Sequence, residues 1–130
     1  MVEAAQMGLT HEAIRAHQGS IQASVPTIAS ALQDLFGQKL AAVMVGVDSP
    51  KAIGRWARGE HRPQPDHERI LRAVYQIAIL LLQAEDHETV RAWFMGMNPY
   101  LGDRAPALVV AERPAEVLQA ARAFVAGGSA

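Results

Sequence analysis

The segment that most constrains the fold of this chain is residues 65–83, PDHERILRAVYQIAILLLQ. Its apolar residues follow helical spacing, and its later turns are apolar on nearly every side. These residues are Ile70, Leu71, Val74, Tyr75, Ile77, Ala78, Ile79, Leu80, Leu81 and Leu82. Such a helix is buried in a core or in a membrane, but a membrane span needs about 20 apolar residues, and Gln76 interrupts this run. We therefore expect a central core helix, capped by Asp66, with other elements packed on each side.

Composition points to an all-α protein. Half of the 130 residues are hydrophobic, which suffices for one domain or for two small ones that share a core. Alanine and leucine abound, and no convincing period-2 strand is present. The chain has no cysteine, which excludes disulfides and thiolate sites. The first residues do not combine a basic stretch with an apolar one, so we expect no secretory signal and a cytoplasmic location.

Three short helices are predicted before the central one, because caps and glycines delimit three segments. They cover residues 24–36, 38–45 and 50–58, and their boundaries are Ser24, Gly37, Gly46, Ser49 with Pro50, and Gly59. In the third segment Ile53 and Trp56 are three residues apart and are predicted to face inward. The order of helix, glycine turn and helix indicates a helix-turn-helix.

A basic stripe lies on the opposite face of the third segment. Lys51, Arg55 and Arg58 stand at positions i, i+4 and i+7. Residues 38–72 hold seven Lys/Arg against four Asp/Glu, although the whole chain has a net charge of −1. Any contact with DNA must therefore come from this local patch. The alternative is an ordinary solvated helix face.

The pattern Gln38-x-x-Ala41, Gly46-Val47, Ile53, Arg55-Trp56-x-x-Gly59 and Pro63 resembles the DNA-binding domain of Xre-type, phage repressor-like regulators. The resemblance implies that the first turns of the third helix enter the major groove of operator DNA. It assigns groove contacts to Ser49, Lys51, Ala52 and Arg55, and phosphate contacts to Arg58 and Arg62. Because readers of this kind usually bind paired half-sites, we expect a homodimer that uses residues 1–36 and the central helix.

After the central helix, the sequence predicts a second helical module. Asp86 is expected to cap a helix that runs to Phe94, with Trp93 in the core. A turn around Asn98-Pro99 follows. A short helix at 105–111 is expected to pack through Leu108 and Val109, and a last helix covers 114–125.

This module resembles the toxin-binding domain of Xre/MbcA/ParS-type antitoxins. The matching residues are Arg91-Ala92-Trp93, Asn98-Pro99, Leu101-Gly102, Pro106, Leu108 and the helix around Val117. The chain departs from the family at Phe94-Met95 after the tryptophan, at Tyr100 inside the Asn-Pro turn, and at Val109-Val110-Ala111, where a glycine-containing turn is usual. The resemblance implies an antitoxin of a type II toxin–antitoxin system, whose partner is a RES-type toxin that degrades NAD or a related ADP-ribosylating toxin. The predicted parts are an N-terminal arm (1–23), a DNA-binding domain with the central helix (24–83), a toxin-binding domain (84–126) and a tail (127–130).

Toxin contacts are expected from the helical surface around residues 104–122 and from the tail. They comprise Arg104, Arg113, Arg122, Gly127, Gly128, Ser129 and Ala130. The tail has no bulky side chain, so it could enter a nucleotide pocket with its terminal carboxylate in place of a phosphate. The alternative for this segment is a frayed terminus.

Signatures of an enzyme are missing from the sequence. The five histidines form no HExxH motif, and neither GxGxxG nor GxxxxGK[ST] occurs. We expect no catalytic residue, no metal, no cofactor and no membrane partner. A stand-alone helix-turn-helix repressor, whose C-terminal half dimerises or senses a ligand, is the main alternative to an antitoxin. A pure scaffolding protein is a third reading, which would make the basic stripe incidental.

Overall fold

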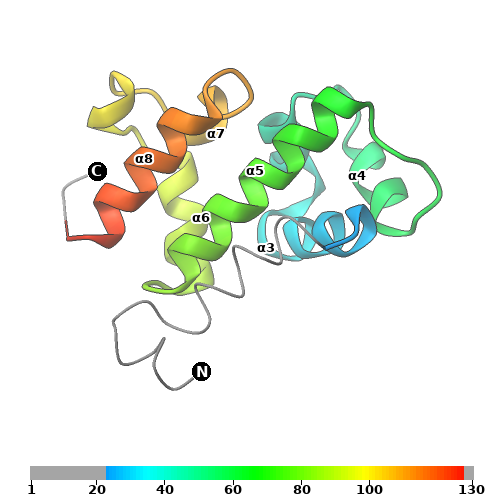
Figure 1. Cartoon of the computed structure of the whole chain (residues 1–130), viewed down its shortest axis with the longest axis horizontal. Coiled ribbons are helices and arrows are strands. Elements are labelled where there is room, and N and C mark those ends of the chain that lie inside the picture. Colours follow the sequence, from blue (N-terminus) through cyan, green and yellow to red (C-terminus); the bar gives the residue numbers. More distant parts are fainter. Residues whose placement is uncertain (1–22, 128–130) are drawn as a thin grey trace.

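The computed structural model describes residues 23–127, and within that range it contains helices and no β-strand (Figure 1). The predicted arm up to residue 22 and the tail residues 128–130 lie outside the described part. The elements are α3 (Val25–Val45), α4 (Pro50–Ala57), α5 (Pro65–Leu82), α6 (His87–Met95), the 3-10 helix η1 (Pro99–Leu101), α7 (Pro106–Val109) and α8 (Pro114–Val125). The predicted all-α class is confirmed.

Helix α5 is the predicted central core helix, and it lies between α3 on one side and α8 on the other (Figure 1). Its buried residues are Ile70, Leu71, Val74, Ile77, Ala78 and Leu81. The sides of α5 next to these buried residues are less buried than the sequence predicts. Their apolar residues are only half-buried: Tyr75, Ile79, Leu80 and Leu82. α5 therefore joins the N-terminal helices and the C-terminal module (residues 84–126) through one shared core.

The predicted cap of α5 is wrong. Asp66 lies inside the first turn, where its carboxylate is 3.8 Å from Arg69, and Gln64 occupies the N-cap position. The reason is Pro65, whose fixed φ suits the first helical position and whose missing N–H costs nothing there. Asp66 still stands near the positive end of the helix dipole.

Helix α3 is two helical segments joined at a sharp break. Gly37 has φ 82° and ψ 163°, which is not helical and which favours glycine. Gly46 ends the second segment with φ 93°, and its N–H donates to the carbonyl of Ala42. Both predicted glycine stops are therefore confirmed. The chain turns back after Gly46 and begins α4 at Pro50, as the sequence predicts.

Helix α4 is fixed by its apolar face. Ile53 and Trp56 are buried, as predicted, and Ala52 and Val47 pack partly against the same core. Ser49 holds the N-cap position, but its side chain makes no capping hydrogen bond, in contrast to Ser24 at the start of α3.

In the C-terminal module, aromatic rings connect α6 to its neighbours. Trp93 is buried, as predicted, and its ring meets Phe94 edge-to-face at 5.2 Å. Phe94 in turn meets Phe36 of α3 at 5.1 Å. Asp86 caps α6 as predicted: its carboxylate accepts the Thr89 N–H at 2.8 Å, and this hydrogen bond lowers the pKa of Asp86.

Helix α7 corrects one expectation. It is shorter than the predicted 105–111, and Leu108 is 60% exposed instead of buried. Pro106, Ala107 and Val109 occupy the inward positions. A helix of one turn has only one covered side, and Leu108 lies on the other side.

None of the helices within residues 23–127 combines the length and hydropathy that crossing a bilayer requires.

Candidate functional site

The residues predicted to contact DNA lie on and around α4, but their charges are not equally available. Arg58 forms a two-bonded ion pair with Glu60, at 2.7 Å and 3.2 Å. Arg62 lies 3.5 Å from Glu68. Lys51 and Arg55 are exposed and form no ion pair with any described residue, although Arg55 attracts Glu60 at longer range. The predicted stripe is therefore reduced to Lys51 and Arg55.

The Arg58–Glu60 ion pair changes the pKa of both side chains. The hydrogen bond from Arg58 lowers the pKa of Glu60, and the same bond raises the pKa of Arg58. Both side chains are more than half exposed, at 59% and 52%, so the pair adds little to folding stability. Its effect is to keep a carboxylate beside the end of α4.

A third cation, Lys39, lies on the same surface as Lys51. A shallow, open depression runs between the break at Gly37 and the start of α4. Its lining comprises Phe36, Gly37, Gln38, Lys39, Ser49, Pro50 and Lys51. We name Lys39, Lys51 and Arg55 the cationic face; Lys39 also forms no ion pair with a described residue. Sequence reasoning did not identify Lys39 as part of this surface, because only the fold brings it next to α4.

Close packing between α3 and α4 holds the cationic face in place. Gln38 donates from Nε2 to Oε1 of Gln33 at 2.7 Å, across the break at Gly37. A Cβ atom on Gly54 would stand 2.6 Å from that same Nε2. The small residue that this close crossing needs is therefore Gly54 of α4, which the sequence analysis did not single out. Ala41 and Ala42 of α3 are also small residues, and both are buried in the core.

The arginines predicted to bind a toxin do not form one cluster on α8. Arg113 is the N-cap residue of α8 and Arg122 lies in its last turn, so the two are at opposite ends of the helix. Arg113 is not free, because it lies 3.6 Å from Glu116. Arg104 and Arg122 are exposed and form no ion pair with a described residue. Gly127 has φ 92° after the end of α8, and Gly128, Ser129 and Ala130 lie outside the described residues.

Exposed apolar side chains mark the C-terminal module instead. Five large apolar residues are exposed within residues 23–127, and four belong to the segment 95–108: Met95, Met97, Tyr100 and Leu108. We call these four the apolar set. Large side chains of this kind, and tyrosine above all, are enriched where proteins bind each other. Sequence spacing alone did not identify them.

The turn that carries Tyr100 is rigidly built. Asn98 is only 2% exposed, and its Oδ1 accepts the Tyr100 N–H at 2.9 Å. Its backbone carbonyl accepts the N–H groups of Leu101 and Asp103, and its own N–H donates to Arg104. Tyr100 stands at this turn with 58% of its surface exposed. A preformed loop of this kind loses little conformational entropy when it binds.

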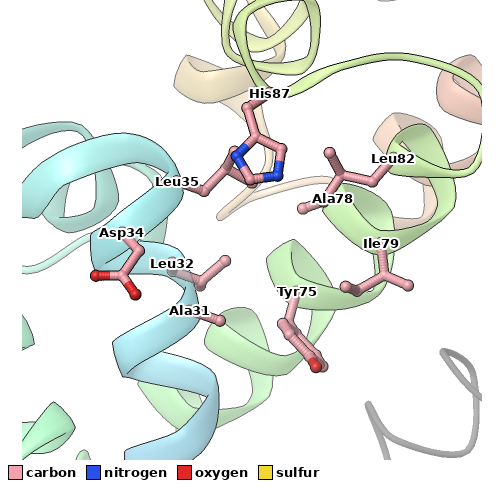
Figure 2. Close-up of a pocket in the computed structure, with 9 residues that line it drawn as sticks. All are labelled: Ala31, Leu32, Asp34, Leu35, Tyr75, Ala78, Ile79, Leu82 and His87. Atoms are coloured by element: carbon pink, nitrogen blue, oxygen red, sulfur yellow. The ribbon is translucent and has the colours of Figure 1, made fainter.

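An apolar groove of about 230 Å³ lies between α3 and α5 (Figure 2). Leu32 and Leu35 of α3 face Ala78 and Ile79 of α5 across it, and His87 stands at one end. Its volume is below that of sites for drug-sized ligands, so it fits one or two side chains. The described residues hold no group of three or more His, Asp or Glu that could bind a metal ion.

No protein-family model, curated protein or solved structure matches this chain.

Proposed function

We propose that this chain is an antitoxin of a type II toxin–antitoxin pair, which binds DNA through α4 and a protein toxin through its C-terminal module. The observation that carries the proposal is the cationic face beside a buried Ile53–Trp56 pair, directly after the Gly46 turn. A helix fixed by its inner side and carrying unpaired cations on its outer side is suited to the major groove. The residue pattern of the Xre-type regulators supports the same role.

In this proposal, Lys51 and Arg55 make the main DNA contacts. Arg55 is one turn beyond Lys51 on the exposed side of α4 and is the candidate for a base edge. Lys39 and the uncommitted hydroxyl of Ser49 are suited to a phosphate. Arg58 and Arg62 have acidic partners, so they contribute less than the family pattern implies.

We propose that the toxin binds to the apolar set and to the Asn98 turn. The chain itself does no chemistry; it covers the cleft of a RES-type toxin that degrades NAD, or of a related ADP-ribosylating toxin, and represses its own operon. Rigid presentation of Tyr100 supports a protein partner, because an exposed aromatic anchor contributes much of the binding free energy at such interfaces.

A stand-alone repressor with a ligand-sensing C-terminal half is the second candidate. The α3–α5 groove is the one feature that favours it, although its volume is small for a ligand. A toxin-sized reading frame next to this gene would favour the antitoxin.

The first prediction concerns the homodimer. We propose that the α3–α5 groove is its interface, because a second copy can insert apolar side chains there. Light scattering should give a dimer for the full chain, and Ile79→Glu should give a folded monomer, since a charged carboxylate would have to leave water to be buried among the apolar side chains of the interface. Val43→Glu, at an exposed apolar position outside the groove, is the matched control and should remain dimeric. A monomer at every concentration would refute the dimer.

The second prediction concerns DNA affinity. Arg55→Ala should weaken binding to the duplex upstream of the chain's own reading frame by about 1–3 kcal/mol, if Arg55 contacts a base edge. Lys51→Ala should weaken binding to all duplexes and reduce the salt slope by about one. The control is Arg69→Ala, which removes an exposed cation from α5 that already has a partner in Asp66. Mobility-shift titrations at several salt concentrations measure both effects. Unchanged affinity in both variants would exclude α4 from the interface.

The third prediction is a gain of affinity. Glu60→Gln should free Arg58 and remove a negative charge beside the cationic face, so DNA binding should tighten and its salt slope should steepen by about one. Glu88→Gln makes the same charge change on α6, in the other module, and should leave the slope unchanged. If the two variants behave alike, Glu60 does not restrain the DNA-binding surface.

The fourth prediction concerns the toxin. Tyr100→Ala should weaken binding to the co-expressed product of a neighbouring reading frame by about 2 kcal/mol, roughly 30-fold, because an aromatic anchor is lost. Val43→Ala is the control for removing exposed apolar surface elsewhere. Calorimetry on purified proteins gives the affinity, and rescue of cell growth gives the protection.

Truncation after Val125 tests the tail separately from the Asn98 turn. If the tail occupies the toxin's pocket, the shortened chain should still bind the toxin but protect cells poorly. Full protection by the shortened chain, together with loss of binding in Tyr100→Ala, would assign inhibition to the module surface. Normal affinity in Tyr100→Ala would remove Tyr100 from the interface.

A further inference from the structure

The break at Gly37 leaves carbonyl groups that the helix itself does not satisfy. The last four carbonyl groups of a helical segment accept no hydrogen bond from within that segment. Leu35 and Phe36 lie in the last turn before the break. Such groups need partners from a side chain or from water. The hydrogen-bond partner of the Leu35 carbonyl comes from a residue that is distant in the sequence.

Arg91 of α6 supplies that partner. Its Nε and Nη2 both donate to the Leu35 carbonyl, at 3.2 Å and 2.8 Å, across 56 residues of sequence. Hydrogen bonds from a charged donor are stronger than those between neutral groups. The next residue, Phe36, is held by the ring of Phe94, also from α6. Helix α6 thus contacts two consecutive residues immediately before the break.

The segment after the break carries part of the cationic face. Gly37 leads into the residues 38–45, which include Lys39 and lead through the Gly46 turn to α4. Phe36 and Gly37 line the same depression as Lys39 and Lys51. The direction in which the chain leaves Gly37 therefore affects how Lys39 and Lys51 are placed relative to each other. Glycine at φ 82° does not fix that direction by itself, because it has many accessible conformations.

We propose that Arg91 is a positioning residue for DNA binding: it ties the C-terminal module to the break at Gly37 and so couples a partner bound on the module to DNA affinity. The inference rests on the proposed function. Arg91 is on α6, in the same module as the apolar set, whereas the cationic face is on α3 and α4. A partner that shifts α6 would act on the Leu35 carbonyl, and by linkage DNA would change the affinity for that partner by the same factor.

The Gln33–Gln38 hydrogen bond is the competing explanation, because it spans the same break. It is neutral and single, whereas Arg91 makes two charge-assisted bonds to one carbonyl. If Gln38 alone held the break, removal of Arg91 would change nothing on the DNA side. Gln38→Ala therefore serves as the comparison variant.

The test measures DNA affinity, its salt slope and amide hydrogen exchange in the full-length chain. Arg91→Leu should weaken binding to the upstream duplex by about tenfold, within the range of allosteric couplings, with an unchanged salt slope. Arg91→Lys, which keeps the charge and one donor group, should recover part of the loss. Arg69→Leu removes an exposed cation of α5 whose acidic partner is Asp66, and should bind like the parent chain. Amides of residues 38–41 should exchange faster in Arg91→Leu than in the parent, while those of α8 should not.

The possible results for these variants decide whether Arg91 has the proposed role. Parental affinity and parental exchange in Arg91→Leu would overturn the inference, and so would a slope reduced by about one, because that marks a direct phosphate contact. A larger loss of affinity in Gln38→Ala than in Arg91→Leu would assign the positioning role to Gln38 and also overturn it. If Arg91→Leu does not fold, Arg91→Lys replaces it, and parental affinity and exchange in that variant overturn the inference. If the parent chain binds no DNA, the proposed function fails, and faster exchange at residues 38–41 still supports the role of Arg91 at the break.

Discussion

Burial of α5 between α3 and α8 is the interaction on which the rest of this structure depends. Leu71, Val74, Ile77 and Leu81 are removed from water, and each such side chain contributes about 1.5–3 kcal/mol to folding. Since α5 packs on both neighbours, neither end of the chain has a separate core among the described residues. The two ends therefore share one packed core, and Leu35 and Phe36, which α6 contacts, belong to it.

Charge pairing decides which cations remain available at the surface. Four arginines in the segment 38–72 have acidic partners, whereas Lys39, Lys51 and Arg55 have none among the described residues. A count of basic residues overstates the attraction for a polyanion, because a bonded carboxylate cancels most of the field of its arginine at a distance. Lys39 and Lys51 lie at the start of α4 and Arg55 lies in its last turn, and this arrangement, more than the net charge of −1, supports the proposed DNA contact.

The two proposed contacts are built on different physical principles. The proposed DNA contact depends on long cations that have no ion pair among the described residues and that a buried apolar pair holds in place. The proposed protein contact depends on a turn closed by the buried Asn98 side chain, which fixes the backbone around Tyr100. Arg91 connects the helix before that turn to the break that precedes the cationic face. Arg91 adds to the shared core and to the Phe36–Phe94 contact, which already join the two parts of the molecule.

The sequence by itself determined the all-α class, the central helix and the glycine breaks at 37 and 46. It also determined the inward positions of Ile53, Trp56 and Trp93. Each of these features depends on residue spacing or on backbone preference within a few residues. Only the tertiary structure decided that Arg58 and Arg62 are paired, that Leu108 is exposed, that Lys39 lies beside Lys51, and that Arg91 bonds to Leu35. Those contacts join residues from different elements or depend on which face of a one-turn helix is covered. Local periodicity carries no information about such choices, since they are set by how complete helices pack against each other.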